Sequence, residues 1–316
     1  PPLVTTQSSE GLVSSFFLFG SRYDSDTQAQ YLDPSSSIST SPSFIKVNVT
    51  SANFTRFDFR TYGAMGISSR DNTILVAGGQ GAGFNPLNSA LILTFTSTGT
   101  ELINFAVKEI APMIILRDYT SGVFLDSGDF LVCGGNSGEF GTVLASCEAY
   151  SITSGIWTSK RSMNLGRYRH NLVFYKGRAV VLGGYHPPNG TLRVCEQYNS
   201  NVDTWSSFPS MMEGRYYFGA AVVGDRIYVA GGVPDSFSMR TPSMEYFDGI
   251  RWNSGSNMTK PRERLAAAPL DGKFVVLDTL YYAELEVYDP SSDSWAVAPY
   301  PKCADGTMAV PVILAQ

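Results

Sequence analysis

The sequence predicts an all-β protein, a closed β-propeller of six four-stranded antiparallel blades, and three observations support this prediction. The first is an internal repeat in which an arginine is followed by a glycine pair, then by a Glu-x-aromatic triplet and a tryptophan. The second is that all four tryptophans of the chain occupy the same place in this repeat. The third is a strand-like C-terminal segment that supplies a strand missing at the N-terminus. A repeat of this length indicates stacked or radial units that cannot bury their own faces alone.

Four copies of the repeat can be read directly. In residues 167–205, Arg167 is followed by Gly183-Gly184, then by Glu196 and Tyr198, and finally by Trp205. The other copies have the same order of residues: Arg117, Gly134-Gly135, Glu148, Tyr150 and Trp157; Arg215, Gly231-Gly232, Glu245, Phe247 and Trp252; and, with VVLDT in place of the glycine pair, Arg262, Glu286, Tyr288 and Trp295.

Each copy predicts four strands, and residues 218–252 show this best. FGAAVV and RIYVAGG are two strands joined by Gly224-Asp225, a pair that suits a two-residue turn because the turn requires positive φ. The run 228–230 is apolar without alternation, as expected of a strand covered on both faces. Residues 244–247 form the third strand, and the segment around Trp252 forms the fourth.

Residues 1–10 are predicted to be an N-terminal tail, and residues 11–316 a single propeller domain. Its blades are expected at about 11–55 plus 305–316, 56–110, 111–162, 163–211, 212–258 and 259–304. The C-terminal segment DGTMAVPVILAQ is expected to pair in blade 1 and close the ring, which leaves no long free edge. Because the sequence has neither an initiating Met nor a signal peptide, we expect a processed chain or an excised domain.

Composition narrows the classes of function. The formal net charge is −5, charged residues make up 16% of the chain, and no basic run occurs, so nucleic acid is not expected as the main partner. No stretch of 18 consecutive apolar residues is present, so no membrane span is expected. An apolar content of 43% is ample for a globular core.

The repeats resemble kelch repeats, which carry the Gly-Gly pair, the downstream tyrosine and the spaced tryptophan quoted above. A Trp-Asp repeat propeller would need Asp after the tryptophan, whereas the four tryptophans precede Thr158, Ser206, Asn253 and Ala296. The resemblance therefore implies a six-bladed kelch β-propeller.

An arginine opens the first strand of five blades, at Arg60, Arg117, Arg167, Arg215 and Arg262, and we expect it to pair with the repeat glutamates. A second arginine two residues later occurs only at Arg169 and Arg264. In substrate adaptors of the kelch type, an arginine in this place lies at the channel mouth and grips acidic peptides. The resemblance thus implies ligand contacts at Arg117, Tyr119, Arg169, Tyr217 and Arg264. The alternative that they are ordinary surface residues stays open.

No catalytic residue, metal site or cofactor is predicted. The sequence lacks Gly-x-Ser-x-Gly, P-loop, His-Glu-x-x-His and Cys-x-x-Cys motifs. Its only histidines are His170, expected to be structural, and His186, expected in an exposed loop; they do not supply the ligands that copper oxidases built on kelch propellers need.

The leading hypothesis is a non-catalytic module that binds an acidic protein or peptide at one mouth of the channel. The first alternative is an extracellular recognition or structural propeller that binds glycans or assembles with itself. The second alternative is a carbohydrate-active or oxidase-type kelch enzyme. The oligomeric state does not follow from the sequence.

Cysteines and sequons bear on the compartment. A hairpin centred near Phe140 would place Cys133 opposite Cys147, and we list this pair as a candidate disulfide. Cys195 takes the same repeat position as Cys147, which predicts a buried apolar site. Candidate N-glycosylation sites are Asn48, Asn53, Asn189 and Asn257, about the number expected by chance. The low charge and abundant Ser and Thr favour the secretory route, with the cytoplasm as the alternative.

Overall fold

The computed structural model describes residues 17–19, 28–32, 44–48, 62–68, 73–81, 84–98, 101–138, 142–235, 239–278, 284–299 and 309–310. Within these ranges every regular element is a β-strand. A helix long and apolar enough to cross a membrane does not occur in this part of the chain.

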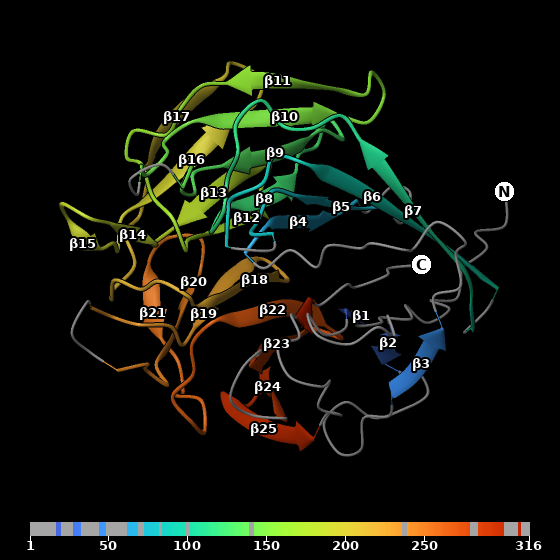
Figure 1. Ribbon diagram of the computed structural model, residues 1–316. Helices are drawn as coiled ribbons and strands as arrows, with labels where there is room; N and C mark the ends of the chain where they lie inside the picture. The colour runs from blue at the N-terminus through green and yellow to red at the C-terminus, as the bar shows by residue number, and fades with distance from the viewer. Residues whose placement is uncertain are drawn as a thin grey trace, which may run out of the picture.

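The strands form four-stranded antiparallel sheets that follow one another in chain order (Figure 1). Five sheets run from β4 to β25, and their first strands β4, β8, β12, β18 and β22 each contact the next one, as the inner strands of propeller blades do. A further four-stranded sheet has the order β26-β1-β2-β3, in which the C-terminal β26 pairs with the N-terminal β1. The predicted propeller of four-stranded antiparallel blades is therefore confirmed.

The strand bounds are as follows. The sheet at the chain ends contains β1 (Phe17–Phe19), β2 (Gln28–Leu32), β3 (Phe44–Asn48) and β26 (Ala309–Val310). The next contains β4 (Ala64–Ile67), β5 (Thr73–Ala77), β6 (Ala90–Thr98) and β7 (Glu101–Ile110). It is followed by β8 (Ser121–Phe124), β9 (Phe130–Cys133), β10 (Cys147–Ser151) and β11 (Ile156–Lys160).

The fourth sheet contains β12 (Asn171–Tyr175), β13 (Arg178–Leu182), β16 (Cys195–Asn199) and β17 (Thr204–Phe208), with a small hairpin of β14 (Tyr185–His186) and β15 (Gly190–Thr191). The last two contain β18 (Gly219–Val223), β19 (Arg226–Ala230), β20 (Met244–Phe247) and β21 (Trp252–Ser254), then β22 (Leu265–Leu270), β23 (Lys273–Asp278), β24 (Glu284–Asp289) and β25 (Ser294–Pro299). The β14–β15 hairpin is the element that the repeat did not predict.

The glycine pair joins each blade to the next one. The N–H of the second glycine donates to the carbonyl of the next blade's repeat arginine, as from Gly184 to Arg215 at 2.9 Å, and the same bond leaves Gly79, Gly135 and Gly232. The first glycine has positive φ, and a Cβ on Gly183 would lie 2.6 Å from the Arg215 carbonyl oxygen. Glycine is needed here because a side chain would fill the space in which two blades meet.

The repeat arginines are structural. Arg117, Arg167, Arg215 and Arg262 are at most 1% exposed and form ion pairs with Glu148, Glu196, Glu245 and Glu286, respectively. The expected arginine–glutamate pairing is confirmed for these four blades. Arg117 also donates to the carbonyls of Gly134 and Ser146, and Glu148 accepts the backbone N–H of Ile114. A buried ion pair is tolerated when the remaining donors and acceptors of both ions are satisfied in this way.

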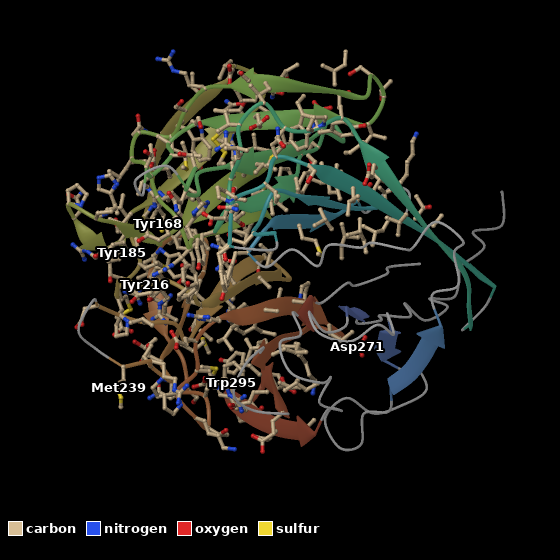
Figure 2. All side chains as sticks on the ribbon, in the orientation of Figure 1. Tyr168, Tyr185, Tyr216, Met239, Asp271 and Trp295 are labelled. Carbon is tan, nitrogen blue, oxygen red and sulfur yellow. A yellow bond between two sulfur atoms is a disulfide. The ribbon has the colours of Figure 1, made fainter. Side chains whose placement is uncertain are left out.

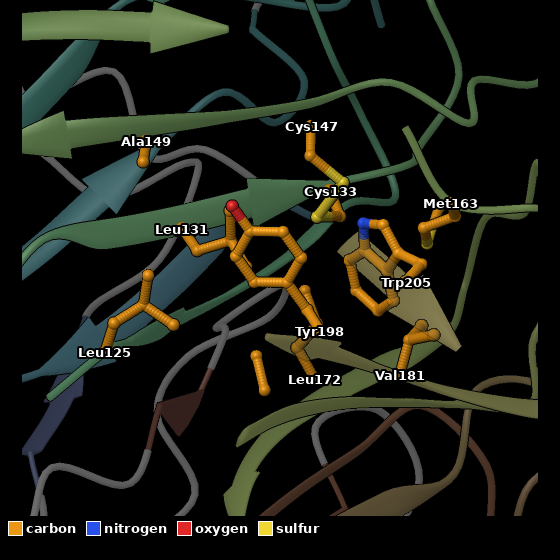
Figure 3. Packing of buried hydrophobic residues seen from close by; sticks show 11 residues of the cluster. Leu125, Leu131, Cys133, Cys147, Ala149, Met163, Leu172, Val181, Tyr198 and Trp205 are labelled. Atoms are coloured by element: carbon orange, nitrogen blue, oxygen red, sulfur yellow. A yellow bond between two sulfur atoms is a disulfide. The ribbon is translucent and has the colours of Figure 1, made fainter. Parts of the chain in front are cut away.

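The core lies between neighbouring blades. One cluster combines Leu131, Cys133 and Cys147 of one blade with Val181 and Trp205 of the next (Figure 3). Each tryptophan indole N–H donates a hydrogen bond of 2.7–2.8 Å to a backbone carbonyl in the segment that follows the preceding blade. The pairs are Trp157 with Ala111, Trp205 with Arg161, Trp252 with Pro209 and Trp295 with Ser256. The tryptophan repeats because each blade needs this contact with its neighbour.

Candidate functional site

The residues two positions after the repeat arginines border one shared cavity. These five residues, called here the mouth residues, are Tyr62, Tyr119, Arg169, Tyr217 and Arg264. All five have φ between 49° and 65°, the left-handed region that non-glycine residues seldom adopt. This backbone conformation costs about 1–2 kcal/mol per residue, so the surrounding structure must hold it in place.

Hydrogen bonds between neighbouring blades hold the mouth residues. The N–H of Arg169 donates to the Tyr119 carbonyl at 2.9 Å, that of Tyr217 to the Arg169 carbonyl at 3.2 Å, and that of Arg264 to the Tyr217 carbonyl at 2.6 Å. Each of these three backbone hydrogen bonds joins mouth residues of two neighbouring blades. The ring is rigid at the place where its side chains face one another, which is how strained backbone is used at functional sites.

The three tyrosines among the mouth residues pack together. The ring centroids of Tyr62 and Tyr119 are 4.3 Å apart in a stacked arrangement. Tyr217 lies 6.0 Å from Tyr119 and 6.1 Å from Tyr62. Side chains from three blades therefore meet at the mouth and form an aromatic cluster.

Three further tyrosines, from blades 4 and 5, extend this aromatic cluster. Tyr168 lies 6.1 Å from Tyr119, Tyr185 lies 5.6 Å from Tyr168, and Tyr216 lies 5.5 Å from Tyr185 and from Tyr217. Tyr168, Tyr185 and Tyr216 gather on one side of the molecule (Figure 2). Together with Tyr62, Tyr119 and Tyr217 they close a loop of six half-buried rings, which we call the tyrosine collar.

Arg169 lies inside the tyrosine collar. Its guanidinium carbon is 4.5 Å from the centroid of Tyr217, 4.8 Å from Tyr119, 4.9 Å from Tyr168 and 5.7 Å from Tyr216. Among the described residues its side chain forms no ion pair and donates no hydrogen bond, and its buried Nε lacks an acceptor. The guanidinium is therefore held by aromatic faces, while its N–H donors stay available to a ligand.

Arg264 reinforces the positive charge. Its guanidinium carbon is 4.8 Å from the Tyr217 centroid, and its Nη1 donates to the Tyr62 hydroxyl at 2.7 Å. Burial raises the pKa of Tyr62 and Tyr217, so both stay neutral and do not cancel the charge of the arginines. Two cations thus flank one neutral ring.

A buried acid, Asp118, interacts electrostatically with Arg169 without forming an ion pair. Asp118 is 2% exposed and accepts a 2.6 Å hydrogen bond from Gln80 Nε2. Burial raises the pKa of this carboxyl group. The positive charge of Arg169 acts in the opposite direction and lowers this pKa, so the two groups interact electrostatically, although no direct ion pair joins them in the described part of the chain.

A cavity of about 130 Å³ adjoins the mouth residues. Beyond those residues its lining consists of Thr120, His170, Asn171, Phe218 and Leu265. His170 is 5% exposed, and burial lowers its pKa to about 3, so the imidazole is neutral. No cluster of three or more His, Cys, Asp or Glu side chains suited to a metal occurs in the ranges that the structure describes.

Four of the five candidate ligand contacts come together. Tyr119, Arg169, Tyr217 and Arg264 meet at the mouth. Arg117 does not, because it is fully buried and bonded to Glu148; its assignment as a ligand contact is corrected to a structural role.

Sequence reasoning missed the remaining tyrosines of the collar. Tyr62 stands two positions after Arg60 and could have been found from the spacing alone. Tyr168 and Tyr216 lie between a repeat arginine and its mouth residue, and Tyr185 follows a glycine pair. The spacing gives no sign that these three rings are in contact.

The other candidate residues lie elsewhere. Cys133 and Cys147, directly opposite in β9 and β10, are joined in a disulfide. Asn189 and Asn257 are exposed, Asn48 ends β3, and Asn53 lies outside the described residues. His186, expected in an exposed loop, is half-buried with its Nδ1 2.8 Å from the Gly166 carbonyl oxygen.

Comparisons with known proteins agree with this architecture. The Kelch motif matches residues 166–212 and 214–259. Comparison of the sequence with curated proteins finds no match. Among 372 matching chains of solved structures, the structure of YjhT is similar with a TM-score of 0.63 and 14% identity over 80% of this chain and 94% of that one. At this identity the likeness concerns the fold alone, and a fold shared so widely does not specify a function.

Proposed function

Since the chain is a kelch-repeat β-propeller, we propose that it is a non-catalytic binding module whose tyrosine collar and Arg169 capture a protein or peptide partner. An acidic side chain of the partner binds the guanidinium of Arg169, and Arg264 assists. The observation that carries this proposal is the state of Arg169, a half-buried cation that has aromatic contacts but forms no ion pair among the described residues.

The chemistry of Arg169 suits a carboxylate. A guanidinium presents its donors in a planar fork that matches the two oxygens of a carboxylate, and such charge-assisted bonds are among the stronger ones in proteins. Because the guanidinium lies over the faces of two tyrosine rings, its position is set before the ligand arrives. Preorganisation of this kind lowers the entropic cost of binding.

The tyrosine collar suits a protein surface. Tyrosine and arginine are enriched among residues that dominate binding energy, and tyrosine supplies a large contact area at a low cost in conformational entropy. The bonds between Tyr119, Arg169, Tyr217 and Arg264 keep the backbone beneath the collar fixed. A rigid aromatic surface with one available cation is the arrangement expected of a binding hot spot.

The test is peptide selection followed by calorimetry. We would select a displayed library of random 12-residue peptides on the wild-type protein and measure the affinity of enriched peptides for Arg169→Ala, Arg264→Ala and the double variant. Enriched peptides should contain Asp or Glu, and Arg169→Ala should weaken binding at least about 30-fold, as loss of a charge-assisted contact of about 2 kcal/mol implies.

The matched control is Arg226→Ala. Arg226 also stacks on a tyrosine, at 5.1 Å from the Tyr246 centroid, but it follows the turn at the far end of β18. This variant should bind the peptides like the wild type. Equal binding by Arg169→Ala, or enrichment of peptides without acidic residues, would overturn the proposed site.

We further propose that the propeller has six blades, with the sheet β26-β1-β2-β3 as the sixth. The antiparallel pairing of Leu18 with Ala309 and the contact between β22 and β26 support this closure. Oxidation of the variant Leu18→Cys with Ala309→Cys should produce a cross-link, whereas Leu18→Cys with the distant Asn201→Cys should not. No cross-link in the first variant would contradict the closure.

A further inference from the structure

Blade 4 carries a hairpin that the repeat does not require, and a sequon lies at its tip. The β14–β15 hairpin projects at the left edge of Figure 1. Asn189 lies in its turn, is exposed, and donates its backbone N–H to the His186 carbonyl at 2.9 Å. The sequence Asn189-Gly190-Thr191 meets the acceptor rule for N-linked glycans.

A second sequon, Asn257-Met258-Thr259, lies in the segment that connects β21 to β22. Asn257 is exposed, while both neighbouring residues are anchored. Met258 is 3% exposed and donates its N–H to the Pro242 carbonyl, and the N–H of Thr259 donates to Glu286. The acceptor asparagine is therefore presented to solvent on a fixed backbone.

The amide groups of both sequon asparagines are available. In the described residues neither side chain makes a hydrogen bond, so a glycan on Nδ2 would break no contact of the fold. Most asparagines outside sequons bond through their side chains instead, namely Asn88, Asn136, Asn164, Asn171, Asn199 and Asn253.

The disulfide points to the compartment in which such glycans are attached. Cys133 and Cys147 are 0% and 2% exposed and lie in an apolar cluster with Met163 and Trp205 (Figure 3). The fold does not need the pair, because blade 4 places Cys195, a free thiol, in the corresponding third strand. Disulfides form and persist in oxidising compartments such as the lumen of the endoplasmic reticulum.

From these observations we infer that the chain passes through the secretory route and carries N-linked glycans on Asn189 and Asn257. The co-reactant is an oligosaccharide linked to a lipid pyrophosphate, used by a lumenal transferase. The amide nitrogen Nδ2 loses a proton and bonds to the anomeric carbon, and the lipid pyrophosphate leaves with the electron pair of the broken C–O bond. Because Tyr185 belongs to both the collar and the β14–β15 hairpin, a glycan on Asn189 would border the collar.

Peptide mapping of the protein from its natural source tests the inference. Trypsin releases residues 179–193, which contain Asn189, and residues 252–262, which contain Asn257, because the bond between Lys260 and Pro261 resists cleavage. After treatment with a peptide N-glycosidase in heavy-oxygen water, both asparagines should be found as labelled aspartate. Unlabelled asparagine in both peptides would overturn the inference, whatever the state of Cys133 and Cys147.

Variants secreted from cultured eukaryotic cells give the second test. Asn189→Gln and Asn257→Gln should each lose one glycan by intact mass, while Thr191→Ser keeps the sequon and should keep the glycan. Asn201→Gln, an exposed asparagine outside a sequon, should not change the mass of attached sugar. Glycan masses that are equal in Asn189→Gln, Asn257→Gln and wild type would contradict the assignment of the two sites.

Discussion

Arg215 offers a direct test of what holds each blade together, because it forms two ion pairs of the same length that differ in burial. Its Nη2 lies 3.0 Å from Glu245 Oε1 and 3.0 Å from Glu213 Oε2. The Glu245 side chain is 3% exposed, whereas that of Glu213 is 40% exposed. The perturbations are Glu245→Ala and Glu213→Ala.

The expected costs differ several-fold. Glu245→Ala removes the acceptor of the Arg215 guanidinium and of the backbone N–H groups of Met212 and Glu213. Loss of one partner from a buried ion pair costs about 3–5 kcal/mol, whereas loss of an exposed partner costs about 1 kcal/mol or less. An unfolding entropy of about 2.1 cal/mol/K per residue, taken over 316 residues, converts these costs into losses of Tm. The expected loss is roughly 5–8 °C for Glu245→Ala and at most about 2 °C for Glu213→Ala.

The assay is thermal unfolding of the two variants and the wild type, followed by tryptophan fluorescence and circular dichroism at one scan rate. Both variants remove a carboxylate that contacts the same arginine atom, and Glu213→Ala also removes the acceptor of the Ser243 hydroxyl at 2.6 Å. A larger loss of Tm in Glu245→Ala therefore reports the effect of burial and of the backbone donors. Equal losses of Tm in the two variants would refute the reasoning that the buried glutamates stabilise the blades.

Three more predictions follow from the scaffold. Gly183→Ala should destabilise the protein by at least about 1 kcal/mol more than Gly224→Ala, as measured by chemical unfolding. Both glycines have positive φ, of 52° and 59°, but only at Gly183 would the added Cβ meet a carbonyl oxygen, at 2.6 Å. Burial lowers the pKa of His170 to about 3, so below about pH 6.5 the unfolded chain binds a proton that the folded chain does not bind. Relative to His170→Gln, the wild type should therefore lose about 1.4 kcal/mol of stability per pH unit between about pH 6.5 and pH 3. Parallel pH profiles of the two proteins would contradict this. Cys133→Ala with Cys147→Ala should lower the free energy of unfolding by about 3 kcal/mol, the loop-closure value for a separation of 14 residues, and unchanged stability under oxidising conditions would disprove it.

The scaffold could be predicted because its signals repeat and are local. A glycine pair, a glutamate and a tryptophan at fixed spacing mark two strand ends and the contacts between blades, so the structure has Glu196 bonded to Arg167 and Trp205 bonded to Arg161. The register of a short hairpin likewise placed Cys133 opposite Cys147. In each case one blade and its neighbour contain the whole interaction.

The site could be predicted only in part because it is assembled from several blades. The resemblance to kelch-type adaptors, applied two positions after the repeat arginine, identified Arg169 and Tyr217, but nothing local indicates that their backbone is left-handed. That conformation depends on hydrogen bonds from neighbouring blades. The contact between Tyr168 and Tyr185 depends in the same way on a hairpin that the other described blades do not share.

The two halves of the Arg-x-mouth-residue segment serve different purposes. The first residue, such as Arg167, is buried and has the same partners in four blades, so changing it would cost stability. The mouth residue two positions later has the same backbone in every described blade, yet its side chain is Tyr at three positions and Arg at two. Since the bonds between neighbouring blades use backbone N–H and carbonyl groups, the side chain can vary without loss of these bonds. The mouth residues can therefore be exchanged without disturbing the ion pairs that hold the blades.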